Sequence, residues 1–235
     1  MTQITTRNRI LIIVTNYTDF QKPKAEPTGL WLSELVHFYD HFEGLAAMDI
    51  VSPSGGTIAI DPRSLRFPVY DKHSRRRHQD PAFMALLQDT PSIHDVDWSQ
   101  YDAVFFAGGH GAMWDFAENA ALHALTVSHY ERGGLLATVC HGAAVLPALR
   151  LRSGAPLIAG KRGTGFAYFD ETVAGVRKLV PYNMQARLTE AGMTYSKAFL
   201  PLAKHVVVDG QLITGQNPNS TQAVAAALQD ALRTR

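Results

Sequence analysis

Short apolar runs alternate along this 235-residue chain with longer stretches whose apolar positions recur at a helical spacing. A short apolar run without polar alternation is typical of a strand buried on both faces of a parallel sheet. Strands that alternate with amphipathic helices predict an α/β fold. The predicted strands span residues 9–15, 46–51, 102–107 and 135–139, and the predicted helices span residues 30–42, 81–89, 118–132, 141–149, 183–191 and 220–233.

Two stretches depart from this alternation. Residues 205–215 read HVVVDGQLITG, in which Asp-Gly separates two apolar runs, and this pattern predicts a β-hairpin. Residues 61–79 have no clear period and are expected to be irregular. The sequence DKHSRRRHQD at residues 71–80 is interpreted as a solvated basic loop, with a binding role for an anionic group as the alternative.

No fixed-period repeat, low-complexity tract or linker divides the chain. We therefore expect one domain over residues 1–235, a single α/β sandwich with a mostly parallel sheet and helices on both faces. In such sheets ligands bind outside the carboxyl ends of the strands. The residues that follow each predicted strand are therefore the first candidates for chemistry.

The composition restricts the possible functions. The chain contains 22 Lys+Arg and 21 Asp+Glu, so it lacks the global basic field that nucleic acid binding requires. The apolar run near the N-terminus is too short for a signal sequence or a membrane span, and we expect a cytoplasmic protein that binds neither nucleic acid nor membrane. A single cysteine excludes an intramolecular disulfide and a Cys-rich zinc site.

That cysteine, Cys140, directly follows the strand predicted at residues 135–139 and precedes His141 and Gly142. A strand that turns at once into a helix exposes the residue at the turn, an arrangement called a nucleophile elbow. The positive end of the following helix is expected to lower the pKa of the Cys140 thiol toward a standing thiolate. The alternative is a small apolar residue in a core turn.

A second turn with candidate chemistry, Gly108-Gly109-His110-Gly111, follows the strand predicted at residues 102–107. Adjacent glycines let backbone N–H groups face the crevice, where they can form an oxyanion hole beside a thiolate. A tight turn explains Gly-Gly-His-Gly equally well. Two such turns at neighbouring strand ends favour a functional site more than either turn alone.

A carboxylate interrupts the apolar pattern of the helix predicted at residues 30–42. Glu34 lies between Leu32 and Leu35, and a glutamate on such a helix usually belongs to a solvated face. If Glu34 were instead buried near Cys140, it would hold or share a proton and could act as a general acid and base.

Two further patterns carry less weight. His37 and His41 have the i, i+4 spacing of metal ligands, but no third ligand is identified, and we expect two ordinary, partly exposed histidines and no metal. The sequence Gly-Thr-Gly at residues 163–165 lacks the spacing of a dinucleotide-binding motif. No cofactor is expected.

Six motifs follow one another along the chain: TGLWLSEL (28–35), DIVSPSGG (49–56), FFAGGHGAMWD (105–115), ATVCHGAAVL (137–146), TGFAYFDET (164–172) and DGQLITGQNPNS (209–220). They occur in the order that is seen in the ThiJ/PfpI superfamily, and they resemble most its heat-shock chaperone and glyoxalase III branch. The resemblance covers residues 9 to about 230 and implies a flavodoxin-like, class I glutamine amidotransferase-like fold.

The resemblance also implies roles for individual residues. Cys140 matches the nucleophile of the family and His141 matches its triad histidine. Glu171 matches the acid that orients this histidine, with Asp170 as the alternative if the register differs by one. Glu34 matches the acid that hydrogen-bonds the sulfur. Gly109 and the backbone of His141 match the oxyanion positions, and Gly108 and His110 are expected to line the substrate site with them.

The function that this resemblance implies is a glyoxalase that needs neither metal nor glutathione and converts methylglyoxal to D-lactate as a D-lactate dehydratase. The expected partners are a small aldehyde substrate and a second copy of the chain in a homodimer. The alternatives are a stress-response holdase that binds unfolded client proteins and a cysteine-oxidation sensor. Amidotransferase or peptidase activity is less favoured, because glutamine hydrolysis would require a histidine distant from the cysteine in sequence.

Overall fold

The computed structural model of the chain describes residues 8–234 and is built around a six-stranded sheet with the order β2-β1-β3-β4-β8-β7. The first five strands in this order are parallel, and β7 pairs with β8 in the antiparallel sense. The strands are β1 (Arg9–Ile13), β2 (Ala47–Val51), β3 (Ala103–Phe106), β4 (Leu135–Val139), β7 (Val206–Asp209) and β8 (Leu212–Gly215).

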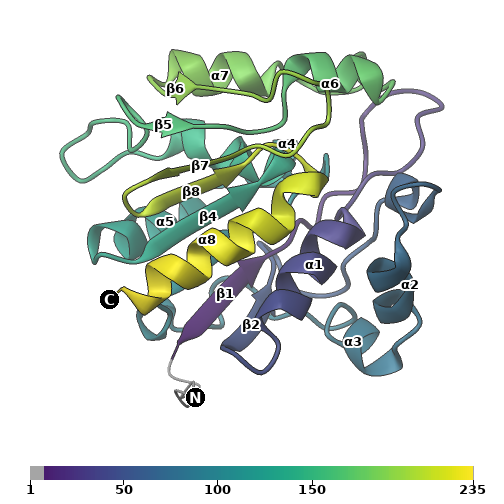
Figure 1. The fold of residues 1–235 in the computed structure, drawn as a ribbon, viewed down its shortest axis with the longest axis horizontal. Helices are drawn as coiled ribbons and strands as arrows, with labels where there is room; N and C mark the ends of the chain where they lie inside the picture. The colour runs from purple at the N-terminus through teal and green to yellow at the C-terminus, as the bar shows by residue number, and fades with distance from the viewer. Residues whose placement is uncertain (1–7, 235) are drawn as a thin grey trace.

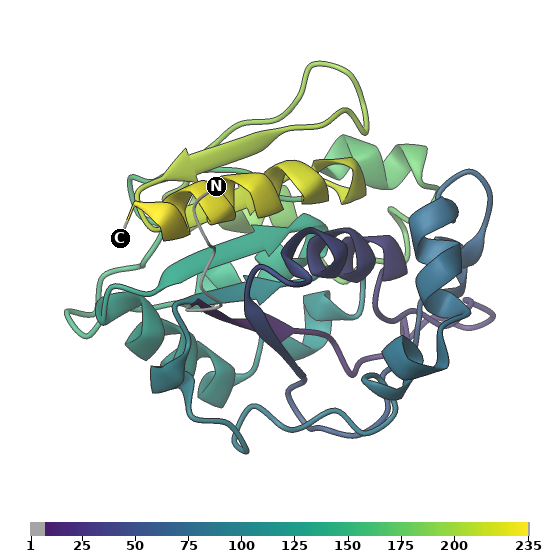
Figure 2. The same ribbon diagram turned by 60° about the horizontal axis from the view of Figure 1, so that its bottom comes forward.

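Helices cover both faces of this sheet, as the sequence pattern predicts (Figures 1 and 2). α1 (Leu32–Phe42) and α8 (Thr221–Arg233) lie together on one face, and α4 (Ala112–Asp115) and α5 (Ala120–Glu131) lie on the other. Every residue of β3 and β4 is buried because the two strands are covered from both sides.

Two groups of shorter elements lie beside this core (Figure 1). α2 (Lys72–His78) and α3 (Pro81–Ala85) follow the 3₁₀ helix η1 (Pro62–Leu65) on the side of α1. At the other end, a two-stranded sheet of β5 (Arg162–Gly163) and β6 (Thr194–Tyr195) accompanies two helices. The remaining elements are α6 (Tyr168–Val173), α7 (Met184–Glu190) and the 3₁₀ helices η2 (Trp98–Gln100), η3 (Cys140–Ala148) and η4 (Pro218–Ser220).

The predicted strands, the hairpin and most of the helices are confirmed, with ends that differ by a few residues. The helix predicted at residues 141–149 is a 3₁₀ helix, η3, which contains Pro147. Pro147 has no backbone N–H to donate and its ring crowds the preceding turn, so a regular α-helix is not favoured there. Within residues 8–234, no helix is both long and apolar enough to cross a membrane.

The prediction of a solvated loop at residues 71–80 is wrong, because most of this segment forms the helix α2. Asp71 caps the helix by accepting a hydrogen bond from the Ser74 N–H at 2.8 Å. Arg77 is buried and forms ion pairs with Asp40 at 2.6 Å and Glu43 at 2.7 Å, both from the region of α1. α2 packs against α1 through charge pairs and has no apolar stripe. Its sequence therefore lacks the helical spacing of apolar residues.

The order of the strands determines where a ligand site can form. The chain passes from β1 to β2 on one side and then returns to β3 on the other side of β1. Parallel sheets bind ligands at such a reversal, outside the carboxyl ends of the strands. The segment before α1 reaches this point, where the Trp31 N–H donates to the Gly108 carbonyl at 3.1 Å. The fold therefore brings the ends of β3 and β4 and the start of α1 together.

Candidate active site

Cys140 occupies a strained turn where β4 passes directly into η3, of which it is the first residue. Its φ angle is 55°, in the left-handed region that residues with a side chain rarely adopt. The turn also requires the glycine two residues later, because a Cβ atom on Gly142 would lie 2.3 Å from the Phe106 carbonyl oxygen. This geometry is that of a nucleophile elbow, as predicted from the sequence.

His141 lies between the thiol and a carboxylate. Its Nδ1 is 3.2 Å from Cys140 Sγ, and its Nε2 is 2.8 Å from Glu171 Oε1 in α6. Burial opposes the charge of Glu171, but the neighbouring histidines outweigh it and hold the pKa of this carboxyl well below its usual range. An ionised Glu171 accepts the Nε2–H of His141, which leaves Nδ1 free to accept the thiol proton.

The structure distinguishes the two acids considered for this position. Glu171 contacts His141, whereas both oxygens of Asp170 serve other partners. Asp170 Oδ2 accepts a hydrogen bond from Gln216 Nε2 at 2.8 Å, and Oδ1 accepts one from the Leu202 N–H at 3.3 Å. Glu171, and not Asp170, is therefore the carboxylate placed to orient His141.

His110 shares the same carboxylate, a relationship that sequence reasoning did not predict. Its Nε2 is 3.1 Å from Glu171 Oε2, and its ring stacks near that of His141 with centroids 4.0 Å apart. Burial and the adjacent His141 lower the pKa of His110 to about 4, so its imidazole is neutral at physiological pH. His110 lines the cavity, as expected for a substrate-binding residue, and it also contacts Glu171 directly.

His110 contacts a partly buried ion pair that the sequence did not reveal. Arg63 donates from Nε and from its backbone N–H to Asp61 Oδ1, both at 2.9 Å, and its Nη2 contacts Asp61 Oδ2. The same Nη2 is 3.3 Å from His110 Nδ1. Asp61 and Arg63 lie in a segment that has neither a regular spacing of apolar residues nor a known motif. Only their two-residue separation could have suggested that they form a pair.

Glu34 is completely buried, so the expectation of a solvated helix face is wrong. Its Oε2 accepts a hydrogen bond from the Gly108 N–H at 2.7 Å, and its carboxyl group interacts with the Cys140 thiol. Burial raises the pKa of Glu34 to about 8, although the hydrogen bonds with Cys140 and Gly108 oppose the increase. Glu34 therefore carries a proton for much of the time near neutral pH.

The expected lowering of the cysteine pKa is also wrong. Burial raises the pKa of the Cys140 thiol well above its ordinary value, and the charge and hydrogen bond of Glu34 raise it further. The His141 N–H favours the thiolate but does not offset these effects. Burial disfavours a negative charge on either Cys140 or Glu34, and a charge on one group disfavours a charge on the other. The expected resting state is therefore a protonated thiol beside His141.

The predicted oxyanion donors separate into two kinds. The Gly108 N–H is already engaged by Glu34, and the His141 N–H interacts with the Cys140 sulfur. The Gly109 N–H has no acceptor among residues 8–234. Gly109 has a φ of +118°, and a Cβ atom there would lie 2.1 Å from the Gly29 carbonyl oxygen, so only glycine fits. Gly109 is therefore the available donor.

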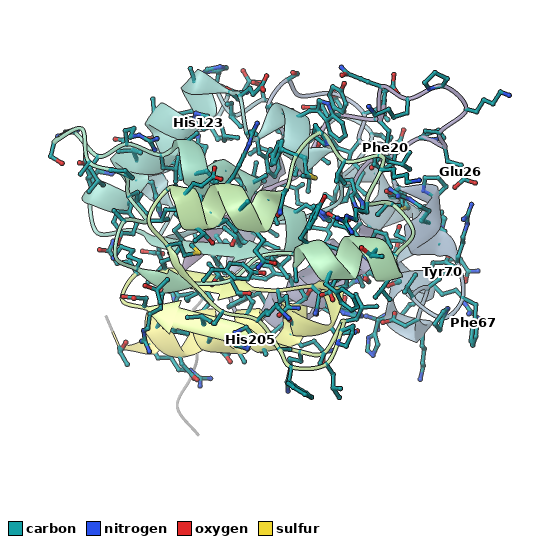
Figure 3. The ribbon with its side chains drawn as sticks, turned by 90° about the horizontal axis from the view of Figure 1, so that it is seen from above. Phe20, Glu26, Phe67, Tyr70, His123 and His205 are labelled. Atoms are coloured by element: carbon teal, nitrogen blue, oxygen red, sulfur yellow. The ribbon has the colours of Figure 1, made fainter. Side chains whose placement is uncertain are left out.

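A cavity of about 310 Å³ opens onto these groups. It connects the buried Cys140 with the exposed Phe67, which projects from the surface in Figure 3. The residues that line it are Trp31, Arg63, Arg66, Phe67, Val69, His110, Cys140, His141, Phe166, Ala174, Val176, Leu202, Pro218 and Asn219.

The histidine pair on α1 does not form a metal site with Glu34. His37 Nε2 is 2.5 Å from Asp71 Oδ2, so this histidine joins α1 to the cap of α2. In the described part of the chain, the ligand-type atoms that come together are those of His110, His141 and Glu171, within 4.8 Å of one another. These atoms already hydrogen-bond one another.

Comparison with known sequences then identifies the family. A sequence model of the DJ-1/PfpI family matches residues 81–231, which include the Cys140 turn, Glu171 and the β7–β8 hairpin. The chain belongs to the DJ-1/PfpI family. The resemblance stated from the six motifs is thereby confirmed.

Relatives of this DJ-1/PfpI protein match nearly the whole chain. The probable glutathione-independent glyoxalase hsp3103 of Schizosaccharomyces pombe is 30% identical over 94% of this chain and 96% of its own length. The glutathione-independent glyoxalase HSP31 of Saccharomyces cerevisiae is 29% identical over 96% of this chain and 98% of its own.

Solved structures agree with this DJ-1/PfpI fold. The rapid encystment protein of Francisella tularensis superimposes with a TM-score of 0.90 and 35% identity, over 96% of this chain and 99% of that one. Glyoxalase III of Candida albicans superimposes with a TM-score of 0.88 and 26% identity, over 96% and 98% of the two chains.

Proposed function

We propose that this protein is a glutathione-independent glyoxalase that converts a 2-oxoaldehyde, such as methylglyoxal, into a 2-hydroxy acid. The observation that carries the proposal is the placement of two proton-transfer groups on one thiol. His141, held by Glu171, lies 3.2 Å from Cys140 Sγ, and the buried Glu34 carboxyl interacts with the same thiol. The names of the yeast relatives support the same activity.

The first step is attack of sulfur on the aldehyde carbon, C1. His141 Nδ1 accepts the thiol proton as the Sγ–C1 bond forms, and Glu171 stabilises the imidazolium. The carbonyl oxygen of C1 becomes an oxyanion, to which the Gly109 N–H can donate. His141 then delivers its proton to this oxygen, which completes a hemithioacetal.

The second step moves a proton from C1 to C2. Glu34 in its carboxylate form removes the C1 proton, and the electron pair forms the double bond of an enediolate. Glu34 returns the proton to C2, while the hydroxyl proton of C1 moves to the oxygen on C2. A pKa of about 8 suits a group that must both take and give a proton near neutral pH.

The last step releases the product from the thioester that remains on Cys140. Water attacks C1 with His141 as the base, the C1–Sγ bond breaks, and sulfur recovers its proton from His141. The sum is R–CO–CHO + H₂O → R–CHOH–COOH, which needs no external oxidant or reductant. With methylglyoxal the product is lactate, and we propose the D-lactate dehydratase type of reaction.

An oxidation sensor is less well supported by the same site. Peroxide reacts with accessible thiolates of low pKa. Cys140 is 3% exposed and its pKa is raised. The homodimer, the cytoplasmic location and a holdase role toward client proteins stay predictions.

The proposal is tested by lactate formation from methylglyoxal without glutathione, in wild type and in Glu171→Gln. Loss of the carboxylate releases His141 from its orientation, so turnover should fall by roughly 10²–10⁴. Oxidation of Cys140 by peroxide, followed by intact mass, should be retained. Normal turnover combined with lost oxidation would contradict the enzymatic role of the triad.

A further inference from the structure

The cavity beside Cys140 is larger than methylglyoxal requires. It measures about 310 Å³, whereas methylglyoxal contains five non-hydrogen atoms. Even if each such atom takes the ~30 Å³ that a water molecule occupies in the liquid, methylglyoxal fills at most about half of this space. The remaining space, which extends from Cys140 to the exposed Phe67, can hold a larger substituent.

The lining of the cavity is mainly apolar. Phe166 and Val176 are buried in its wall, and Trp31, Val69 and Leu202 contribute further apolar surface. Among the described residues, no aspartate or glutamate lines it.

The two arginines in the lining are already paired with acids. Arg63 pairs with the buried Asp61, and Arg66 pairs with Glu26 at 2.5 Å. The cavity therefore holds no unpaired acid for a cationic group, and each of its arginines has an acidic partner, although Nη1 of Arg63 has no hydrogen-bond partner among residues 8–234. Its larger apolar surface favours an uncharged apolar substituent.

Exposed apolar side chains are concentrated in segments that include or adjoin lining residues in sequence. Of the eight large hydrophobic side chains that are exposed in residues 8–234, six lie in the short segments 67–69, 169–173 and 199–200. Phe67 and Val69 line the cavity themselves, segment 169–173 directly precedes the lining residue Ala174, and segment 199–200 ends two residues before the lining residue Leu202. Exposed apolar residues are thus close in sequence to residues of the cavity wall.

We infer that the substrate of this enzyme is a 2-oxoaldehyde with a bulky, uncharged apolar substituent of about six carbon atoms. This inference rests on the proposed glyoxalase function. C1 and C2 lie at Cys140, and the substituent occupies the space bounded by Phe166, Val176 and Leu202. The reaction is unchanged, with R as an alkyl or aryl group in place of methyl.

The test compares cyclohexylglyoxal with methylglyoxal, because both carry an alkyl group on the ketone and their carbonyls are electronically similar. We expect kcat/KM of the wild-type enzyme to be at least tenfold higher for cyclohexylglyoxal. Leu202→Asn is the diagnostic variant, since Leu202 has a φ of 56°, which asparagine tolerates. It should lower kcat/KM for cyclohexylglyoxal at least threefold more than for methylglyoxal.

Val208→Asn is the matched control, because Val208 is an exposed residue of β7 outside the cavity lining, and both rates should match wild type. Equal or faster turnover of methylglyoxal by wild type would overturn the inference while leaving the glyoxalase function intact. Absence of hydroxy acid from both aldehydes would instead overturn the proposed function. The wild-type ratio decides the question even if Leu202→Asn does not fold.

Discussion

His110 and Glu171 are joined by a contact of 3.1 Å between Nε2 and Oε2, while the other oxygen of the same carboxylate holds His141. Glu171 therefore has both oxygens occupied by imidazole donors. A carboxylate with a single partner could rotate about its terminal bond, whereas this one is fixed at two points. In the proposed mechanism, His110 therefore helps to position Glu171, the carboxylate that orients His141 as the base.

Replacement of His110 by alanine should lower kcat for methylglyoxal by about 10–100-fold, the usual effect of losing a partner that orients a catalytic group. The change of KM should be smaller, since the loss concerns proton transfer. His110→Asn, which retains an amide donor toward Glu171, should recover part of kcat.

Steady-state kinetics on these variants and on His205→Gln check this prediction. His205 bonds Ser196 Oγ at 2.8 Å and does not line the cavity, so its replacement should leave kcat near the wild-type value. If kcat of His110→Ala equals that of wild type, the contact of His110 with Glu171 does not contribute to catalysis.

Replacement of Glu34 by glutamine should reduce turnover by roughly 10²–10⁴, because the amide cannot carry a proton between C1 and C2. The side-chain oxygen of glutamine can still accept the Gly108 N–H, so the fold should be preserved. Lactate assays and circular dichroism on Glu34→Gln, with Glu190→Gln at the exposed end of α7 as control, measure this. Unchanged turnover by folded Glu34→Gln protein would remove Glu34 from the mechanism.

The raised pKa of Glu34 has a consequence for stability. Folding favours its protonated form, so this contribution is fully present below the ordinary pKa of 4.5 and is lost as the pH rises through about 8. Between pH 5 and pH 8, wild type should therefore lose about 3 kcal/mol of unfolding free energy relative to Glu34→Gln. Urea titrations of both proteins at these two pH values test the difference, and parallel stabilities would show that Glu34 titrates normally.

The Cys140 thiol should ionise above the ~8.5 of a free cysteine. Burial and the Glu34 charge both raise its pKa, so Glu34→Gln should move the midpoint downward. A titration of thiolate absorbance near 240 nm follows this directly. A wild-type midpoint below pH 7 would mean that the resting enzyme holds a thiolate and that the proton transfer to His141 is not needed.

The sequence predicts the parts of this site that follow from local pattern. Apolar runs that end in Cys140 and in Gly108-Gly109 are visible without a structure, because strand ends and turns are encoded over a few residues. The position of Glu171 is implied by the resemblance to a family. Asp-Gly between two apolar runs predicts the antiparallel hairpin.

Other features depend on contacts between distant segments. Glu34 is an ordinary helix glutamate in sequence, and its burial arises only when α1 packs against the turn after β3. Arg77 lies in a run of charges, and it is buried because Asp40 and Glu43 of a separate segment neutralise it. The raised pKa of Cys140 likewise follows from burial, which outweighs the local effect of the turn.

The proposed mechanism is tested most directly by measuring lactate formation from methylglyoxal without glutathione, in wild type and in Cys140→Ala. Wild type should form lactate and Cys140→Ala should form none above the uncatalysed background, since every step proceeds through the sulfur. Lactate formation at equal rates by both proteins, or by neither, would contradict this mechanism.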